Sequence, residues 1–285
     1  MTHFIPDSIQ PGILCLRAAL NCMPDLEHLY LENALENADD FISSVGLNVL
    51  QKISVPCLTR LFIITPVSSI VTLLSSISFP LHTKMRLECR NEDDISLDIC
   101  DQLCHILAQK YSNDHMWTPQ TIPSVVMKFS SDQVALAFNT SSECNYEPTW
   151  TYSMTAVRWG RNTPLLEMVI NLPEPRNALF GSDICISIPT TNIQTLHIIN
   201  PASSCRTFWE KTSGHLPGLR RMKLSRGCMA NGLISILCPQ TSGGLVENQR
   251  ISVPKLDELE LDRMRFKTDP RSGSDSDAVL VQRRR

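Results

Sequence analysis

The sequence has no strong excess of either charge. Its 26 Lys and Arg residues stand against 29 Asp and Glu residues, which gives a net charge of −3. Proteins that bind nucleic acid normally carry a clear basic excess. We therefore expect no nucleic-acid partner.

Targeting and membrane segments are also missing. The first residues, MTHFIPDSIQPG, lack the basic head and apolar run of a signal peptide. The longest uncharged run, residues 61–79, nearly reaches the length of about 20 residues that a membrane span needs. It contains Pro66, five serines and two threonines, which indicates a strand, a turn and then a helix. We expect no membrane association and a cytoplasmic or nuclear location.

The eleven cysteines follow no metal-site spacing. Cys100 and Cys104 would share one face of a helix, but His105 would point about 100° away from them. No second Cys/His pair stands at the spacing of a zinc site. Without a secretory signal, the pattern predicts reduced core thiols and neither a metal nor another cofactor.

Catalytic signatures are absent as well. There is no Gly-x-Ser-x-Gly motif and no phosphate-binding glycine loop, since no Lys follows Ser242-Gly243-Gly244. The seven histidines are scattered along the chain. We expect a protein that is not an enzyme. Because catalytic triads assemble in space, a hydrolase or other enzyme on an unrelated α/β fold is one alternative, and a truncated, non-functional gene product is another.

The chain does contain a repeated nine-residue phrase. MPDLEHLYL begins at Met23, and similar phrases begin at Val55, Leu216 and Val253. Each has a proline two positions before its first leucine, and proline suits the start of a strand better than its middle. Alternation within a strand then predicts one buried set: Leu29, Leu31, Leu61, Ile63, Met222, Leu224, Leu259 and Leu261.

Looser copies fill the intervals between these phrases. First apolar positions at 26, 58, 82, 122, 165, 193, 219 and 256 lie about 33 residues apart, with the register at 165 open by one residue. Helix-like stretches follow at 38–50, 68–77, 97–110 and 232–238. A single strand and helix cannot bury its own apolar face, but stacked copies can. This predicts an α/β fold, an irregular leucine-rich-repeat solenoid with a curved, mostly parallel sheet and helices on its convex side.

The middle of the chain breaks the pattern. QVALAFNTS and TWTYSMTAVRW read as two strands around the polar loop SSECNYEP. We interpret residues 130–162 as a β-hairpin insertion, or as strands added to the same sheet. The predicted organisation is a lead-in at 1–22, the solenoid at 23–266, and a polar, disordered tail at 267–285.

The proline-containing phrase, its irregular spacing and the FSSDQVALAF segment together resemble the leucine-rich-repeat regions of the large F-box-like families of mushroom-forming fungi. The resemblance covers residues 20–266. It implies a substrate-recognition region like those of ubiquitin-ligase adaptors, in which an F-box docks on the ligase and the repeats hold the substrate. The chain shows no recognisable F-box, because Pro11-Gly12 interrupts the one faint candidate. Ligase docking is therefore not expected.

The outward positions of the strands are the candidate binding surface. They are expected to be His28, Tyr30 and Glu32; Arg60, Phe62 and Ile64; Lys84, Arg86 and Glu88; Thr195, His197 and Ile199; Arg221, Lys223 and Ser225; Glu258, Glu260 and Asp262.

Two parts of this surface lead to different expectations. Arg221 and Lys223 are expected to pair with Glu258 and Glu260 on the next strand, as simple solvated charges. Exposed aromatic side chains mark contact sites instead. The predicted partner-binding patch is therefore His28, Tyr30, Arg60 and Phe62, facing a protein or an acidic or amphipathic peptide.

Overall fold

The computed structural model describes a mixed α/β protein whose strands are mostly parallel. The chain divides into two compact units: unit 1 comprises residues 1–120 and 159–171, and unit 2 comprises residues 121–158 and 172–285. The described residues are 12–33, 52–89, 95–112, 122–142, 148, 163–173, 176–188, 192–200, 211–212, 215–229 and 256–266.

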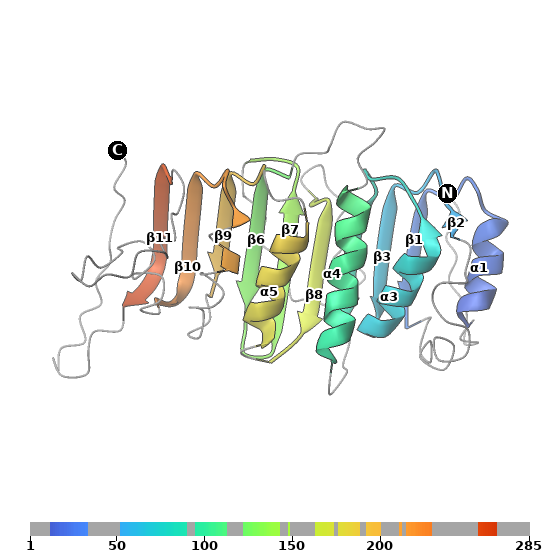
Figure 1. Cartoon of the computed structure of the whole chain (residues 1–285), viewed down its shortest axis with the longest axis horizontal. Coiled ribbons are helices and arrows are strands. Elements are labelled where there is room, and N and C mark those ends of the chain that lie inside the picture. The colour runs from blue at the N-terminus through green and yellow to red at the C-terminus, as the bar shows by residue number, and fades with distance from the viewer. Residues whose placement is uncertain are drawn as a thin grey trace, which may run out of the picture. The chain divides into compact units, whose positions relative to one another are not determined.

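Unit 1 is built on a parallel sheet flanked by helices (Figure 1). The strands pair in the order β1 (His28–Glu32), β3 (Arg60–Thr65), β5 (Lys84–Cys89) and β8 (Leu166–Asn171). The helices are α1 (Ile13–Asn21), α3 (Val67–Ser76) and α4 (Leu97–Ser112), and a short second sheet pairs β2 (Ile53–Ser54) with β4 (Ile77–Ser78). Helix α3 packs on β3 and β5 and lies beside α4.

The long uncharged run forms a strand and a helix, as predicted. Strand β3 ends at Thr65, Pro66 caps the next helix, and α3 runs from Val67 to Ser76. Proline fits there because the first turn of a helix has no internal partner for its amide. None of the helices in the described part of the chain is long and apolar enough to cross a membrane. The predicted helix at 97–110 is confirmed as α4, whereas the stretches at 38–50 and 232–238 lie outside the described residues.

Helix α1 was not predicted from the sequence. We expected Pro11-Gly12 to break any helix there, but the helix begins directly after this pair, at Ile13. The Gly12 carbonyl accepts hydrogen bonds from the amides of Cys15 and Leu16. Ile13, Leu16 and Leu20 are buried, which is the spacing of one helical face. A proline ahead of the first turn therefore leaves the helix intact, because it removes no hydrogen bond from the helix interior.

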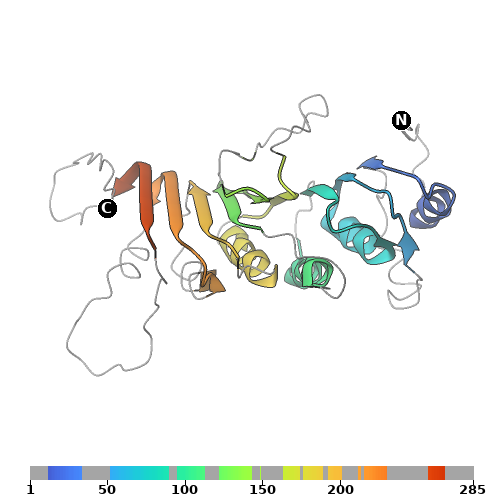
Figure 2. The same ribbon diagram turned by 90° about the horizontal axis from the view of Figure 1, so that it is seen from above.

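Unit 2 has a sheet of five described strands (Figure 2). Their order is β7 (Gln133–Asn139), β6 (Ser124–Phe129), β9 (Thr195–Ile199), β10 (Arg221–Met229) and β11 (Glu258–Phe266). Helix α5 (Arg176–Ser187) packs on β6 and β7. A Cβ at Gly181 would lie 3.4 Å from the Phe129 ring, an ordinary contact distance, so α5 lies directly against the sheet at this position.

Of the two strands predicted in the middle of the chain, the first is described, and it belongs to the same sheet as its neighbours. QVALAFN forms β7, but it pairs antiparallel with the preceding strand β6, and TWTYSMTAVRW lies outside the described residues. The turn is short: the Ser130 amide donates to the Gln133 carbonyl at 2.9 Å, and the Ser130 hydroxyl donates to Asp132 Oδ1 at 2.9 Å. A loop of a few residues costs little closure entropy, which favours this pairing of consecutive strands.

The strands in the middle of the chain do not pair in the order in which the repeats follow one another in sequence. Strand β5 pairs with β8, although β6 and β7 lie between them in sequence, and β6 pairs with β9. The repeats at 122 and 165 are therefore not neighbours in that order. The open register at 165 is resolved, because Leu166 aligns with Met85 and so shares the face of Leu61.

The prolines of the phrase occupy tight turns. The amides of Leu26, Leu58 and Leu219 donate to the carbonyls of Met23, Val55 and Leu216, at 3.1, 3.3 and 3.1 Å. Pro24, Pro56 and Pro217 thus hold the second position of a four-residue turn, where a fixed φ is favourable. We expected proline at the entry to the strand and not in its middle, and the structure places it in the turn just before the strand.

The same backbone hydrogen bonds recur where strands begin. The Glu27 carbonyl accepts from the amides of Thr59 and Arg60 at 2.8 and 3.1 Å. The carbonyls of Pro123, Gln194 and Arg220 accept the equivalent pair from the neighbouring strand, at 2.7–3.0 Å. The phrase therefore produces one local geometry in both units.

A positive backbone φ also recurs at one position of the phrase. Five positions after the start of β1, β9, β10 and β11, the backbone adopts a positive φ of 50–54°. The residues are Asn33, Asn200, Arg226 and Arg263. Asparagine tolerates this left-handed conformation better than arginine does.

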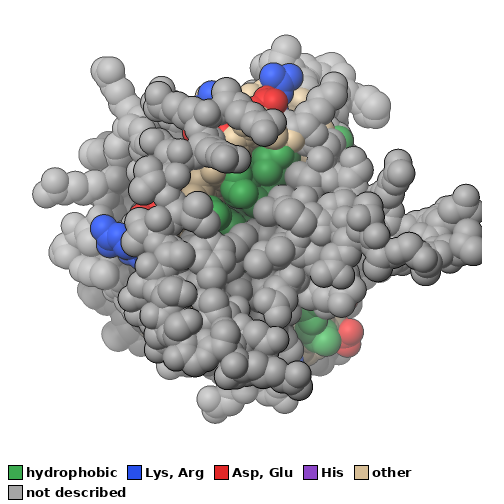
Figure 3. All heavy atoms as spheres, turned by 90° about the vertical axis from the view of Figure 1, so that its left-hand side faces the viewer, with side chains coloured by type: hydrophobic (Ala, Val, Ile, Leu, Met, Phe, Trp, Pro, Cys, Tyr) green, Lys and Arg blue, Asp and Glu red, His purple; other side chains and the backbone are tan. Residues whose placement is uncertain are grey.

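The predicted core is confirmed at six of its eight positions. Leu29, Leu31, Leu61, Ile63, Met222 and Leu224 are at most 5% exposed. Leu259 and Leu261 are only half-buried. They lie on β11, which pairs with β10 alone among the described strands, so one flank lacks a neighbouring strand. Figure 3 looks onto this end of the chain, where hydrophobic side chains remain visible near charged ones.

Candidate functional site

The structure brings the predicted partner-binding residues together on β1 and β3. His28 is in register with Arg60, and Tyr30 is in register with Phe62. The two rings stack with centroids 4.6 Å apart and an interplanar angle of 23°. His28, Tyr30 and Arg60 are half-buried, which leaves part of each side chain accessible.

Phe62 and Ile64 are not exposed, contrary to our expectation. They are 3% and 1% exposed. The Phe62 ring stacks on Tyr30 and also lies 5.6 Å from the guanidinium carbon of Arg86. Such ring and cation–π contacts stabilise a buried aromatic side chain. Phe62 therefore supports the patch from beneath and is not itself a contact residue.

A row of basic side chains crosses three neighbouring strands. His28, Arg60 and Lys84 are aligned by the strand register, and all three are half-buried. Burial, and then the charge of Arg60, lower the pKa of Lys84. Equivalent positions of adjacent strands lie about 4.8 Å apart, so the positive charges are crowded. The row therefore suits an anionic group.

Arg86, expected outside, lies in a buried ion cluster. Its guanidinium is 3.3 Å from Glu167 and 3.8 Å from Glu88, and all three residues are at most 6% exposed. Our expectation that Arg86 and Glu88 are solvated was wrong. Paired carboxylates explain why an arginine can stay charged at this depth. At such depth the cluster cannot contact a protein partner, and its Arg86–Glu167 pair links β5 to β8.

The outward face of β10 and β11 behaves as predicted. Arg221 Nε lies 3.5 Å from Glu258 Oε2, and Lys223 Nζ lies 2.7 Å from Glu260 Oε1. The strand register places the members of each pair directly opposite one another. These charges neutralise each other and stay exposed to solvent, so they do not form a charged binding site.

The outward face of β9 is covered, which the sequence did not indicate. Thr195, His197 and Ile199 are 7%, 8% and 2% exposed. The chain after β7 supplies partners for polar side chains of these strands. The Ser142 carbonyl accepts a hydrogen bond from the Thr195 hydroxyl at 3.4 Å, and the Pro148 carbonyl accepts one from Lys128 Nζ at 3.2 Å.

One Ser–His contact bears on the alternative of a hydrolase. His197 Nε2 and Ser225 Oγ share a hydrogen bond of 3.0 Å, the geometry of a nucleophile and its base. Both residues are at most 8% exposed. A substrate carbonyl could not reach the Ser225 hydroxyl without displacing the residues that cover it. The pair is better explained as two buried polar groups that satisfy one another.

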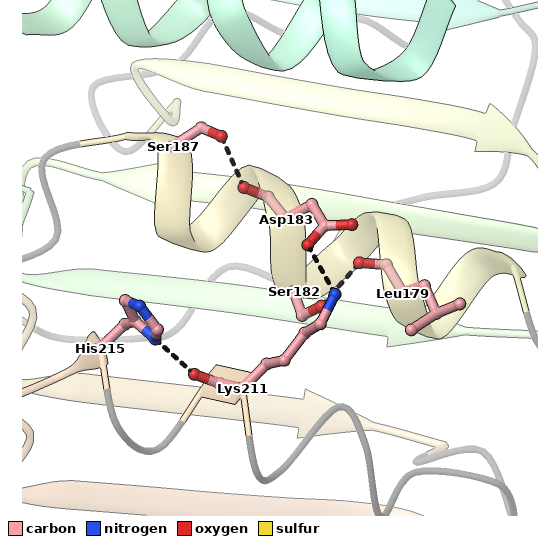
Figure 4. A network of polar contacts seen from close by, with 6 residues as sticks. All are labelled: Leu179, Ser182, Asp183, Ser187, Lys211 and His215. Atoms are coloured by element: carbon pink, nitrogen blue, oxygen red, sulfur yellow. Dashed lines mark hydrogen bonds and ion pairs between the residues drawn. The ribbon is translucent and has the colours of Figure 1, made fainter. Parts of the chain in front are cut away.

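A second group of catalytic residue types lies at α5 (Figure 4). The hydroxyls of Ser182 and Ser187 donate to the carbonyls of Leu179 and Asp183, at 2.6 and 2.7 Å. His215 Nδ1 lies 2.7 Å from the Lys211 carbonyl, and Lys211 Nζ lies 3.3 Å from Asp183 Oδ1. Each polar group is thus engaged within its own helix or in a surface ion pair, which does not make a triad.

The cysteines fit the prediction of core thiols in part. Cys89, Cys100, Cys104 and Cys185 are buried, whereas Cys15, Cys22 and Cys57 are exposed, and none of these seven forms a disulfide. His105 is exposed beside Gln109 and faces away from the two helix cysteines. Within the described residues, no group of three or more His, Cys, Asp or Glu side chains is placed to hold a metal.

Comparison with known proteins yields no relative. No family model, no curated protein and no solved structure matches the chain.

Proposed function

We propose that the chain is a non-catalytic protein-interaction protein that binds an acidic segment of a partner through the outward face of unit 1. The observation that carries the proposal is the basic row of His28, Arg60 and Lys84, which adjoins the stacked ring of Tyr30. Arginine binds carboxylates through two parallel hydrogen bonds, and tyrosine adds apolar contact area at low entropic cost.

We further propose that the fold is an irregular leucine-rich-repeat solenoid, related to the substrate-recognition repeats of the F-box-like families. The recurring turns, the paired hydrogen bonds where strands begin and the positive φ five positions after the strand start support this reading. They are what stacked copies of one unit would produce. In such proteins the outward face of the sheet is a common binding surface, which agrees with the position of the basic row.

Like-charge crowding gives the physical reason for an acidic partner. A carboxylate between Arg60 and Lys84 would relieve their repulsion, which already lowers the pKa of Lys84. The side chains are half-buried, so the attraction is screened less by salt than it would be for fully exposed charges. A partner with an apolar residue next to its acidic ones would also cover the Tyr30 ring.

The test uses a fluorescein-labelled peptide library in three matched sets. The first set contains acidic residues. In the second set each acidic residue is replaced with Gln, and in the third with Lys. Fluorescence anisotropy should detect binding of acidic peptides that weakens with added salt. Replacing both Arg60 and Lys84 with Ala should weaken that binding about ten-fold or more.

The matched control is Arg221→Ala with Lys223→Ala, which removes two cations from the outward face of unit 2. It should leave acidic-peptide binding unchanged. Equal binding of the acidic and Gln peptides, or equal loss in both double variants, would refute the proposed site. Tyr30→Ser should reduce binding of peptides that carry an apolar residue and spare purely acidic ones.

A further inference from the structure

Unit 1 contains an open groove of about 1200 Å³ that the proposed function does not use. It lies between α3, α4 and the short sheet of β2 and β4. Its apolar wall includes Val71, Leu74, Ile77, Phe79 and Leu107. Pockets that bind small ligands commonly combine such a wall with a few polar groups.

Lys110 supplies the main polar group of the groove. It lies in the last turn of α4, and its Nζ donates a hydrogen bond of 3.1 Å to the Phe79 carbonyl. The same nitrogen lies 3.2 Å from the centroid of the Phe79 ring. Burial, and then the charge of Lys52, lower the pKa of Lys110 to about 7. The geometry thus fixes an amino group at the edge of the apolar wall.

The charged groups facing the groove are mostly basic. Lys52, which precedes β2, and His82, which follows β4, line it together with Lys110. Asp101 and His105 line it from α4. Among the described residues, neither Lys52 nor Lys110 has a carboxylate within ion-pair distance. Two lysines therefore face one space that holds a single described carboxylate.

We propose that this groove binds a small amphipathic anion, with Lys110 and Lys52 holding its charged head and the wall of α3 and α4 taking its apolar body. An anion would offset the repulsion between the two lysines, which a neutral ligand cannot do. A cation would increase that repulsion. The apolar wall would add binding energy in proportion to the ligand surface it covers.

The test uses 8-anilinonaphthalene-1-sulfonate, a fluorescent amphipathic anion, with the full chain. Its fluorescence should rise on saturable binding, and decanoate should displace it. The neutral probe N-phenyl-1-naphthylamine should bind more weakly, and decylammonium should not compete. Near-ultraviolet circular dichroism checks that the folded protein is being measured, since partly unfolded chains also bind this dye.

Matched variants assign the site to the two lysines. Lys110→Ala and Lys52→Ala should each weaken binding of the sulfonate several-fold, while Lys110→Arg should retain most of it. Lys211→Ala, which removes an exposed lysine of unit 2, is the control and should change nothing. Equal affinity for the anionic and neutral probes, or no loss in either groove variant, would overturn the proposal.

A pH series provides an independent readout. The sulfonate stays charged throughout, so affinity should fall between pH 6 and pH 9 as Lys110 loses its proton in the free protein. Lys110→Arg should remove most of this dependence, because arginine stays protonated. The other titratable groups that face the groove are His82, His105, Lys52 and Asp101, and all four are unchanged in the arginine variant. An unchanged pH profile in the arginine variant would show that Lys110 does not hold the anion.

Discussion

Units 1 and 2 carry the same repeated phrase but use its outward positions in different ways. At the start of unit 1, equivalent positions of adjacent strands repeat a positive charge, as at Arg60 and Lys84. At the end of unit 2, they alternate in sign, as at Lys223 and Glu260. The inward positions carry large apolar side chains in both units, such as Leu61 in unit 1 and Leu224 in unit 2. The phrase therefore determines the backbone and the core, while the outward residues are free to differ.

The largest expected effect comes from the buried cluster of unit 1. Arg86→Met would leave Glu88 and Glu167 buried without their shared cation. We expect a loss of about 3–5 kcal/mol in the free energy of unfolding. Arg221→Met, which breaks an exposed pair in unit 2, should cost about 1 kcal/mol or less. Urea unfolding followed by circular dichroism compares the two, and similar losses would mean that the depth of the pair does not matter.

The next largest difference between the two units should come from truncating core side chains, measured as the loss in the free energy of unfolding. Leu61→Ala removes a side chain with no exposed surface and should cost about 2–5 kcal/mol. Leu261→Ala removes a half-buried side chain at the edge strand β11, so we expect about 1 kcal/mol. From the sequence alone, native-like packing predicts about 2–5 kcal/mol for Leu261 as well, and less if the end of the chain frays. Equal losses in urea unfolding would show that β11 is covered more fully than the described residues indicate.

Alternation along the strands was sufficient to predict which residues face the core. The period of two is a local property, so Leu29 and Met222 could be assigned without knowing the fold. The same alternation could not show which outward-facing residues are covered by other parts of the chain. Arg86 is buried because Glu167, far away in sequence, lies on the neighbouring strand. His197 is buried although its alternation is the same as that of the half-exposed Lys223.

The candidate site was predicted to a similar degree. Placing His28 beside Arg60, and Tyr30 beside Phe62, needed only a parallel register, and the structure confirms it. The groove residue Lys110 could not be found, because its environment depends on Phe79 and Lys52, which lie on other elements. A lone lysine near the end of a predicted helix gives no such signal.

Backbone conformation at the positive-φ positions should show a smaller difference. Asn33 in unit 1 and Arg263 in unit 2 occupy equivalent positions with φ of 50° and 54°. Asn33→Val should destabilise by about 1–2 kcal/mol, because a branched residue disfavours this conformation. Arg263→Asn should instead stabilise by up to about 1 kcal/mol. Thermal unfolding of both variants measures this, and a loss of stability in Arg263→Asn would contradict the expectation.

The smallest effects should have opposite signs in the two units. Lys84 has a lowered pKa because burial and the charge of Arg60 disfavour its protonated form in the folded state. Removing that charge with Lys84→Met should raise the free energy of unfolding by a few tenths of a kcal/mol. Lys223→Met, which breaks the 2.7 Å pair with Glu260, should lower it by about 0.2–1 kcal/mol.

The pH dependence follows from the direction of the shift at Lys84. The unfolded chain binds more protons than the folded one between the lowered pKa of Lys84 and its ordinary pKa of 10.5, so stability should rise with pH in that window. Lys84→Met should remove this rise, while Lys223→Met should keep it. Added salt should shrink both effects, because each depends on partly exposed charges. If the two variants shift stability in the same direction at low salt, the basic row is already neutralised, and the contrast between the two outward faces does not exist.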